Sequence, residues 1–283
     1  MVSTTPLSIA HAALADALLP VVTAAARIQM RYFRTGIEVV TKADATPVTA
    51  ADHESELLII ASLFAIAPGV PVVAEEAVAA GDKPKVARKA GAEFFLVDPL
   101  DGTREFINGR PEFTINIALV RDGVPRFGVI YAPALGVLYA TLSDNQAVEV
   151  RLPPDATLRC MSELKPLAIH TRPPPATGLV AVASRSNNSP GTDAFLGQYN
   201  IARRTAAGSS IKFCVVAKGD ADIYPRFGPT CEWDIAAGHA ILAAAGGSVT
   251  QLDGQALRYG NHAQKFRNPD FVAWGRGPIA PQH

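Results

Sequence analysis

The chain has 283 residues, which is enough for one large domain or two small ones around a sizeable core. Its 26 basic and 26 acidic residues give a formal net charge of zero, which argues against nucleic-acid binding over a broad surface. The hydrophobic content of 48% is that of an ordinary globular protein. The three cysteines are odd in number, have no metal-binding spacing and fit a reducing cytoplasm: Cys160, Cys214 and Cys231.

Two helices are expected near the N-terminus. Residues 8–33 carry apolar side chains at helical spacing, and they lack the basic start of a signal peptide and are interrupted by Asp16. A second helix follows Pro47, with Thr49 as its N-cap and Asp52 three residues later, as in a capping box. The apolar side of this second helix is expected to consist of Leu57, Leu58, Ile59 and Leu63.

Short apolar runs separated by turn residues then predict strands. They lie at 71–74, 94–98, 114–121, 126–132 and 136–141, and the last three indicate a meander. The proline-rich stretch from Leu152 to Pro175 breaks the pattern. It separates an N-terminal α+β half, residues 1–155, from a C-terminal α/β half, residues 156–283.

The second half alternates between strands and helices, which predicts an α/β layer. The strands are expected at 179–183, 221–225 and 248–251, and the helices at 190–199, 209–218 and 233–245. The charge-free stretch after Asp234 contains Gly246 and Gly247, so it fits a helix, a turn and a strand and not a membrane span. Four basic residues of the first half predict a solvated loop: Lys83, Lys85, Arg88 and Lys89.

Five carboxylates occupy the kinds of position that build a phosphate site. They follow apolar runs or stand in the first turns of helices: Asp52, Glu75, Asp98, Asp101 and Asp234. Asp and Glu offer only hard oxygen ligands, which suit Mg²⁺ and not zinc or copper. A protein interior does not tolerate that many acids in one cleft unless cations neutralise them.

The motif DPLDGT carries most of this signal. Pro99 biases Asp98 away from helical geometry, so Asp98 is expected to end a strand. The turn that follows leaves the Leu100 carbonyl free as a neutral ligand. Gly102 allows the backbone to approach a phosphate, and Thr103 begins a helix whose first N–H groups attract anions. An Asp-Gly turn with capping acids is the ordinary alternative.

The other residues of the site also have ordinary interpretations. Glu75 belongs to an acidic pair that could face water, and Asp52 and Asp234 could be simple helix caps. His53 and His239 are expected to be structural because the rest of the site offers only oxygen. Trp233 is expected in the core.

A second cluster surrounds the sequence GSSIK. Gly208, Ser209 and Ser210 at a helix start can donate N–H and hydroxyl groups to a phosphate. Lys212 and Arg226 can add positive charge, and Arg can bind phosphate with two parallel hydrogen bonds. The alternative is a capped helix with surface cations, which would be favoured if the carboxylates were absent.

These motifs resemble the inositol monophosphatase superfamily of Mg²⁺-dependent, Li⁺-sensitive phosphatases. Its hallmarks are an acid after a strand, Asp-Pro-hydrophobic-Asp-Gly-Thr and a later Trp-Asp pair, which appear here as Glu75, DPLDGT and Trp233-Asp234. Within the superfamily, DGTREF, FTINIALV, GSSIKFCVVA, YPRFGPT and WDIAAGHA are similar to the bacterial 3′(2′),5′-bisphosphate nucleotidase branch. The resemblance extends from about residue 40 to residue 270.

The resemblance implies a layered αβαβα sugar-phosphatase fold of the α/β class, with the active site between its two halves. It implies that Glu75, Asp98 and the Leu100 carbonyl bind one Mg²⁺, that Asp98, Asp101 and Asp234 bind a second, and that Glu75 helps a third, weaker ion. Asp52 and Thr103 are then the catalytic pair that orients the attacking water. Substrate contacts are expected from Glu75, Leu100, Asp101, Gly102, Thr103, Ser209, Lys212, Arg226 and Asp234.

The implied activity is hydrolysis of the 3′-phosphate of adenosine 3′,5′-bisphosphate to AMP and phosphate by metal-activated water. In a cell this would clear a by-product of sulfate activation. An inositol- or sugar-phosphate phosphatase of the same superfamily is the first alternative, and a non-catalytic nucleotide or phosphate sensor is the second. The expected partner is this small nucleotide, without nucleic acid or a transmembrane segment. The expected location is the cytoplasm, and peripheral attachment to the inner membrane stays open.

Overall fold

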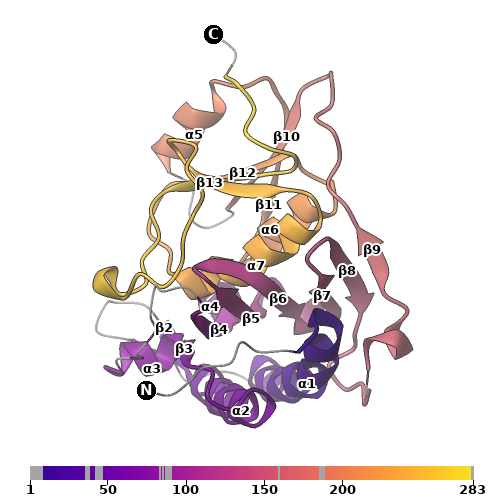
Figure 1. The fold of residues 1–283 in the computed structure, drawn as a ribbon, viewed down its shortest axis with the longest axis vertical. Coiled ribbons are helices and arrows are strands. Elements are labelled where there is room, and N and C mark those ends of the chain that lie inside the picture. Colours follow the sequence, from indigo (N-terminus) through magenta and orange to yellow (C-terminus); the bar gives the residue numbers. More distant parts are fainter. Residues whose placement is uncertain are drawn as a thin grey trace.

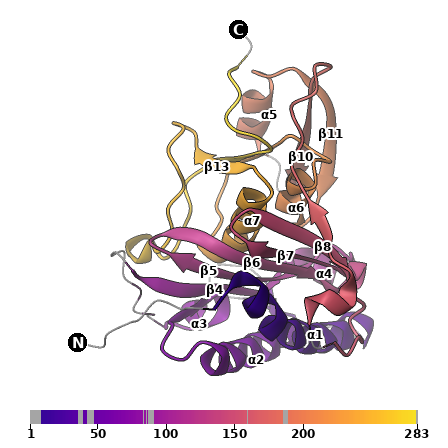
Figure 2. The same cartoon turned by 45° about the vertical axis from the view of Figure 1, so that its right-hand side comes forward.

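A computed structural model describes residues 9–35, 39–41, 47–82, 84, 86, 91–158, 160–184 and 189–281. In this part of the chain two sheets and three sets of helices are stacked in five layers, helix, sheet, helix, sheet, helix (Figures 1 and 2). This arrangement is the predicted αβαβα fold. The four basic residues assigned to a solvated loop (Lys83, Lys85, Arg88 and Lys89) lie outside the described residues.

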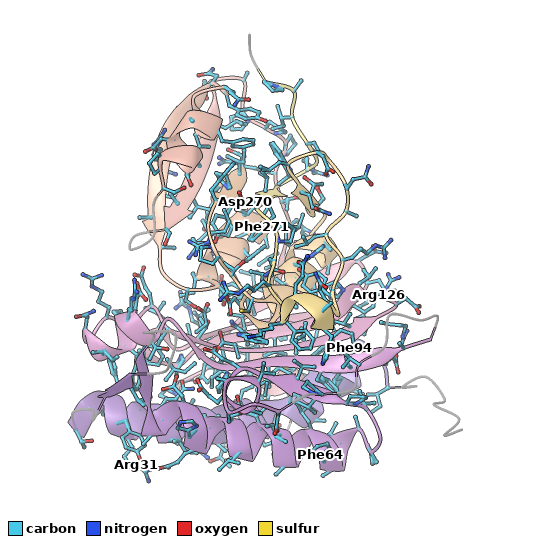
Figure 3. The ribbon with its side chains drawn as sticks, turned by 90° about the vertical axis from the view of Figure 1, so that its left-hand side faces the viewer. Arg31, Phe64, Phe94, Arg126, Asp270 and Phe271 are labelled. Atoms are coloured by element: carbon cyan, nitrogen blue, oxygen red, sulfur yellow. The ribbon has the colours of Figure 1, made fainter. Side chains whose placement is uncertain are left out.

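The first layer consists of two long helices, α1 (His11–Thr35) and α2 (Ala50–Ile66). Both lie under the first sheet, and Figure 3 labels Phe64 on this layer and Phe94 in the sheet above it. Among the described residues, α1 is the one helix long and apolar enough to cross a membrane, and half of its apolar window is buried inside the protein. Its buried face packs on α2 and the sheet as a core helix does.

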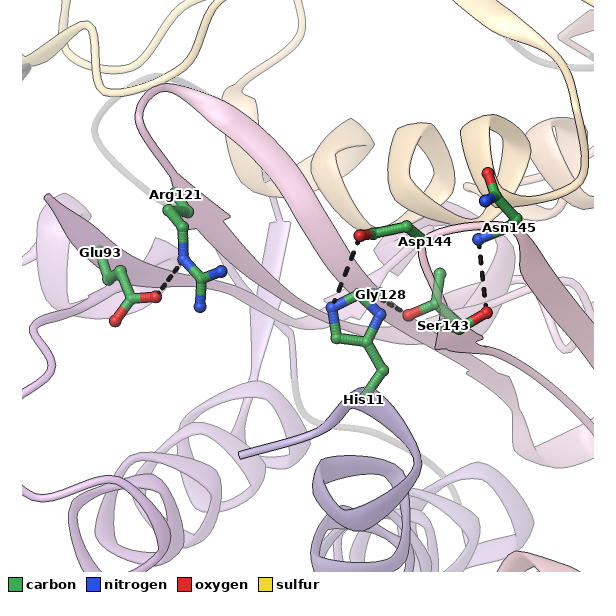
Figure 4. Close-up of polar contacts among 8 residues, drawn as sticks. His11, Glu93, Arg121, Gly128, Ser143, Asp144 and Asn145 are labelled. Carbon is green, nitrogen blue, oxygen red and sulfur yellow. Dashed lines mark hydrogen bonds and ion pairs between the residues drawn. The ribbon is translucent and has the colours of Figure 1, made fainter. Parts of the chain in front are cut away.

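The first sheet has seven strands in the order β3-β4-β5-β6-β7-β8-β9. Their bounds are β3 Val72–Ala74, β4 Glu93–Asp101, β5 Thr114–Arg121, β6 Val124–Ala132, β7 Val137–Ser143, β8 Gln146–Arg151 and β9 Leu167–Ile169. Only β3 runs parallel to its neighbour, so the sheet is an antiparallel meander with one added edge strand. Polar contacts at its periphery, such as that between Glu93 and Arg121, connect neighbouring strands (Figure 4).

The second sheet has five strands in the order β11-β10-β12-β14-β13. Their bounds are β10 Leu179–Ser184, β11 Ile201–Ala207, β12 Ile223–Arg226, β13 Ser248–Gln251 and β14 Phe271–Trp274. β10 is parallel to both β11 and β12, whereas β14 is antiparallel to its neighbours. The helix α5 (Pro190–Leu196) covers the outer face.

Two helices, α6 (Ile211–Ala217) and α7 (Glu232–Ala244), form the layer between the sheets. α7 lies directly on β6: a Cβ atom added at Gly128 would stand 2.3 Å from the carbonyl oxygen of Ala237. The largest core cluster fills this layer and includes Cys214 and Trp233, the latter as predicted. The first sheet and the helices α6 and α7 can therefore line the same cavity.

Four further short elements belong to the fold. They are the paired strands β1 (Val39–Thr41) and β2 (Pro47–Thr49), and the single-turn helices α3 (Glu75–Ala79) and α4 (Thr103–Ile107). Both single-turn helices begin where a strand of the first sheet ends. Glu75 and Asp101, two of the acids singled out in the sequence, lie at these two junctions.

Most predicted elements agree with the structure, and the differences have physical reasons. Six strands were not predicted: β1, β2, β8, β9, β11 and β14. The predicted apolar side of α2 is partly wrong, because Leu57 is 71% exposed whereas Ile59 and Leu63 are buried. The chain passes from the first sheet to the second between β9 and β10, inside the proline-rich stretch. The division of the chain at residue 155 stays a prediction. The strand β9 lies after that residue and still belongs to the first sheet.

Candidate active site

A cavity of about 570 Å³ opens between the end of β4 and the starts of α4, α6 and α7. Every site residue predicted from the sequence lines it except Asp52 and Gly208: Glu75, Asp98, Leu100, Asp101, Gly102, Thr103, Ser209, Ser210, Lys212, Arg226 and Asp234. Elements from both sheets and from the helix layer between them contribute to its wall. The fold thus brings together residues that are separated by more than half of the chain.

Three acids form the centre of the cavity. The carboxylates of Glu75, Asp98 and Asp234 offer oxygen atoms that all lie within 4.8 Å of one another. Burial raises the pKa of Asp98 well above its usual range, and the charge of Glu75 raises it further. Burial also raises the pKa of Asp234, with Asp101 and Glu75 adding to the effect. Without a cation, the site resists full ionisation.

Local structure fixes two of these acids. Asp98 lies near the end of β4, and its Oδ1 accepts a hydrogen bond of 3.0 Å from the Leu100 N–H, which turns the chain. Asp234 is the third residue of α7, and its Oδ2 accepts the Cys231 N–H at 2.8 Å, as in a capping box. A capping role and a ligand role are compatible, because each carboxylate keeps a second oxygen for the cavity.

Glu75 is positioned by a residue that the sequence analysis did not identify. It opens α3, and the N–H groups of the next two residues, Glu76 and Ala77, each donate a 2.7 Å hydrogen bond to Glu56. Glu56 is 4% exposed and projects from α2. Its position four residues after Asp52 on the same helix was the available signal, because residues at that spacing share a face.

Asp52 and Thr103 approach each other beside the cavity. Asp52 uses Oδ2 for the Thr49 backbone N–H at 2.8 Å and the Thr49 hydroxyl at 2.5 Å, which is the predicted cap. Its Oδ1 lies 3.5 Å from the Thr103 hydroxyl. That hydroxyl also lies 3.2 Å from the Leu100 carbonyl oxygen. Thr103 has one hydrogen for these two acceptors, so a change at Leu100 alters what Thr103 can donate to Asp52.

Asp101 faces the second half of the chain. Its Oδ2 accepts a 2.6 Å hydrogen bond from the Ser209 hydroxyl. Burial raises the pKa of Asp101, while the bond from Ser209 and the charge of Lys212 lower it. Ser209 has a left-handed backbone with φ 51°, just before α6. The hydroxyl hydrogen of Ser209 is donated to Asp101. A hydrogen bond that this hydroxyl donates to a substrate would therefore have to replace the bond to Asp101.

The two predicted cations lie in different surroundings. Lys212 is 5% exposed; its Nζ donates to the Ser209 carbonyl oxygen and lies over the ring of Tyr224 at 5.5 Å. Burial lowers the pKa of Lys212 to about 8, although Asp101 counteracts this. Arg226 ends β12 and donates to the Pro229 carbonyl oxygen at 3.2 Å. Both line the same cavity as the acids.

The donor set of the cavity fits a hard divalent cation. All three side chains of the acid cluster are carboxylates, and a buried group of carboxylates is stable as anions only beside positive charge. The two histidines do not belong to this set: His239 bonds Tyr259 at 2.9 Å, and His53 does not line the cavity. The acidic cluster can therefore hold a metal ion.

Comparison with known proteins identifies the family that the sequence motifs resemble. Residues 10–280 match the model of the inositol monophosphatase family. The 3′(2′),5′-bisphosphate nucleotidase CysQ of Escherichia coli K12 is 41% identical over 236 residues, which cover 83% of this chain and 88% of the relative. The CysQ of Haemophilus influenzae is 30% identical over 245 residues, or 87% of this chain and 86% of the relative.

Solved structures share the fold. The crystal structure of CysQ from Bacteroides thetaiotaomicron superposes with a TM-score of 0.75 at 33% identity, and covers 94% of this chain and 98% of that one. An inositol monophosphatase from Anabaena has a TM-score of 0.69 at 24% identity, over 93% of this chain and 90% of that one, which speaks for the fold alone. On the family match and these identities, the chain belongs to the inositol monophosphatase family.

Proposed function

We propose that this chain is an Mg²⁺-dependent 3′(2′),5′-bisphosphate nucleotidase that converts adenosine 3′,5′-bisphosphate to AMP and phosphate. The observation that carries the proposal is one cavity lined both by a carboxylate cluster and by two cations, Lys212 and Arg226. A substrate with two phosphates needs both, whereas a monophosphate needs only the first. The nucleotidase names of the relatives support the same substrate class.

Two to three Mg²⁺ ions are part of this proposal. Glu75, Asp98 and the Leu100 carbonyl would hold one ion, and Asp98, Asp101 and Asp234 a second, while Glu75 would help a third and weaker one. Bound there, the ions would neutralise the charge of the phosphoryl group and lower the pKa of a water molecule. Asp98 is the shared ligand, and it is also the most deeply buried of the clustered acids.

Thr103 and Asp52 are the residues proposed to handle the proton of the attacking water. Asp52 Oδ2 is occupied by the cap of α2, so Oδ1 remains for Thr103. When the Leu100 carbonyl is turned to a cation, the hydroxyl hydrogen of Thr103 has Asp52 as its acceptor. The lone pairs of Thr103 then accept the hydrogen of a water and orient it, and Asp52 is the base that receives the proton.

The backbone at Gly102 is proposed to contact the phosphate that reacts. Gly102 has φ 89°, a left-handed conformation, and a Cβ atom there would lie 3.1 Å from the Glu112 carbonyl oxygen. A side chain at this position would therefore be strained and would narrow the approach to the backbone.

Arg226 and Lys212 are proposed to meet the second phosphate, and Ser209 to contact the nucleotide. Arg226 can present a planar pair of N–H donors to a phosphate, as guanidinium groups do. Lys212 adds a charge from a position beside Asp101, where it also stabilises that carboxylate. A cytoplasmic location belongs to the proposal as well, as does peripheral contact with a membrane.

Phosphate release from four substrates tests the function. The purified protein with Mg²⁺ is given adenosine 3′,5′-bisphosphate, its 2′ isomer, inositol 1-phosphate and fructose 1,6-bisphosphate, with an EDTA-treated sample as control. We expect the two nucleotides to be preferred by kcat/KM. Preference for inositol 1-phosphate or the sugar bisphosphate would replace the nucleotidase proposal by the sugar-phosphatase alternative. Nucleotide binding without turnover of any substrate would favour a sensor.

A further inference from the structure

Two residues of β5 lie opposite the acids of β4. In the antiparallel register Asp98 pairs with Asn116 and Asp101 pairs with Thr114, with a bulge between the two pairs. Side chains of paired residues share one face of a sheet, with Cβ atoms about 5 Å apart. Thr114 and Asn116 are both fully buried although they are polar. The strand next to the acids therefore carries polar groups that need partners.

Their partners come from the start of α6. The Thr114 hydroxyl lies 2.5 Å from the Ser209 hydroxyl and 2.8 Å from the Ser210 hydroxyl. Ser210 also donates to Asn116 Oδ1 at 2.7 Å. Ser209 donates to Asp101 Oδ2 at 2.6 Å. These four residues, named here the hydroxyl cluster (Thr114, Asn116, Ser209 and Ser210), connect the two halves of the chain at the metal site.

The direction of the hydrogen bonds follows from counting hydrogens. A carboxylate beside a cation is an acceptor only, so the single hydrogen of the Ser209 hydroxyl is directed at Asp101. Ser209 must then accept at its contact with Thr114. The single hydrogen of Thr114 is assigned to this contact because, at 2.5 Å, it is shorter than those to Ser210, at 2.8 Å, and to Asn116 Oδ1, at 3.0 Å. The order is Thr114 to Ser209 to Asp101. A hydroxyl that receives a hydrogen bond is a stronger donor, so Thr114 strengthens the bond to Asp101.

We propose that Thr114 is a positioning residue for the metal site, which fixes the Ser209 hydroxyl on Asp101 and thereby sets the orientation of that ligand. Thr114 contacts neither substrate nor ion in this assignment. Residues that hold metal ligands by hydrogen bonds commonly change metal affinity by about 10–100-fold when they are removed. The inference rests on Asp101 being a metal ligand, as set out in the proposed function, and gives a role to a residue of the FTINIALV motif to which the sequence analysis assigned none.

An unpaired donor supports the idea that the cluster serves a ligand. The amide nitrogen of Asn116 is buried and has no hydrogen-bond acceptor among the described residues, while its oxygen accepts from Ser210 at 2.7 Å. A buried donor without an acceptor is costly and uncommon in proteins. Because Asn116 pairs with Asp98, the unused donor belongs to the strand register of the metal site and not to a distant part of the core.

Metal binding tests the proposal without any substrate. Mg²⁺ is titrated calorimetrically into ion-free wild type and the variants Thr114→Val and Thr114→Ser. Valine keeps the shape of threonine and lacks the hydroxyl, so we expect an approximately tenfold weaker Mg²⁺ affinity. Serine keeps the hydroxyl, so we expect an affinity close to wild type. Melting temperatures of the ion-free proteins are measured in parallel.

Thr141→Val is the matched control. Thr141 is also fully buried in the first sheet, and its hydroxyl accepts the Gly128 backbone N–H at 3.1 Å; it does not line the cavity. We expect this variant to have a lower melting temperature than wild type and to bind Mg²⁺ with the affinity of wild type. If both valine variants weakened Mg²⁺ binding equally, Thr114 would act through general stability and the proposal would be wrong.

A second variant keeps the proposal testable if Thr114→Val does not fold. Ser209→Ala removes the hydroxyl that reaches Asp101, at a partly exposed position, and should weaken Mg²⁺ binding to a similar extent. Unchanged Mg²⁺ affinity in Ser209→Ala or in folded Thr114→Val would overturn the positioning role while leaving the metal site in place. Failure of wild type to bind Mg²⁺ would instead overturn the metal site itself, and this inference with it.

Discussion

The carboxylate of Glu56 accepts the backbone N–H of Glu76 at 2.7 Å, and this contact fixes the start of the helix that presents Glu75. A carboxylate at a helix start is favourable because it satisfies N–H groups that have no partner in the helix. Here the carboxylate comes from another helix and is buried. Burial is the main reason that the pKa of Glu56 is raised to about 7, and the charges of Glu76 and Glu75 add to it.

The raised pKa of Glu56 predicts how stability depends on pH. A carboxyl group whose pKa is about 7 in the folded state and about 4.5 when unfolded stabilises the fold below pH 4.5, and this contribution is lost as the pH rises to 7. The loss is at most about 1.4 kcal/mol per pH unit. Chemical unfolding of the ion-free protein between pH 5 and pH 8 should show this decline.

Glu56→Gln should reduce that decline, because an amide does not titrate. It should also weaken Mg²⁺ binding, since one of the two N–H groups of α3 loses its acceptor and Glu75 is held less firmly. Glu54→Gln is the control on the same helix, where a half-exposed carboxylate bonds Arg31. An unchanged pH slope and unchanged Mg²⁺ affinity in Glu56→Gln would show that Glu56 does not control Glu75.

Asp98→Asn should abolish turnover and yet make the ion-free protein more stable at pH 7.5. The pKa of Asp98 is raised by burial and by Glu75, so its ionised form destabilises the fold in the absence of a cation, and the amide removes that charge. At pH 4, where the wild-type carboxyl is largely protonated, the stability difference should shrink. Urea unfolding in EDTA at both pH values, with phosphate release, measures this.

Asp222→Asn provides the contrasting control for this prediction. Asp222 is equally buried, but Arg172 donates to both of its oxygens, at 2.9 and 2.8 Å, and the Val180 N–H adds a third bond. Its amide variant should be less stable than wild type at pH 7.5, because partners of the carboxylate are lost. If Asp98→Asn behaved like Asp222→Asn, Asp98 would be a satisfied structural acid and not a metal ligand.

Much of the site was predictable because its parts are local motifs. The Thr49–Asp52 cap and the turn after Asp98 each need only residues within three or four positions. The cap was predicted as the structure shows it, whereas β4 does not end at Asp98 as predicted but continues through a bulge to Asp101. The supporting contacts were not predictable in this way. Glu56 bonds a residue 20 positions away, and Thr114 bonds Ser209 across 95 positions. Only the fold brings such partners together.

The errors in the fold have a related cause. The helix α2 is apolar on more than one side, so its pattern did not reveal that the buried face would carry Asp52 and Glu56 and leave Leu57 outside. The strand β11 (Ile201–Ala207) is an edge strand with mostly exposed residues and two arginines, which hides its strand character. In both cases neighbouring elements, and not the local sequence, decide which residues are buried.

Thr103→Val should remove catalysis while leaving Mg²⁺ binding intact. The hydroxyl of Thr103 lies 3.5 Å from Asp52 and is proposed to orient the attacking water, but it is not a proposed metal ligand. A loss of about 10²–10⁴-fold in kcat is expected for a positioned proton-transfer group. Thr103→Ser, which keeps the hydroxyl, should retain much of the activity. Equal losses in both variants would mean that the hydroxyl alone does not explain the effect, and the proposed orientation of the water by Thr103 would lose its support.

Arg226→Ala should change substrate choice more than chemistry. Arg226 lines the same cavity as the acids and is proposed to bind the 5′-phosphate, through charge-assisted hydrogen bonds worth about 1.5–3 kcal/mol. The KM for adenosine 3′,5′-bisphosphate should therefore rise by about 10–100-fold, while kcat changes little. A monophosphate such as inositol 1-phosphate does not use this contact, so kcat/KM for its hydrolysis should hardly change.

Two further variants test whether the change in KM caused by Arg226→Ala comes from a contact with the second phosphate. Arg204→Ala removes a half-exposed arginine that bonds Asp193 outside the cavity, and it should alter neither substrate. Lys212→Ala should impair both substrates, because Lys212 lies beside Asp101 as well as in the pocket wall. The measurement is kcat/KM for each substrate in all three variants. If Arg226→Ala reduced both substrates equally, as Lys212→Ala is expected to do, Arg226 would serve the shared metal site, and the cavity would have no separate place for a second phosphate.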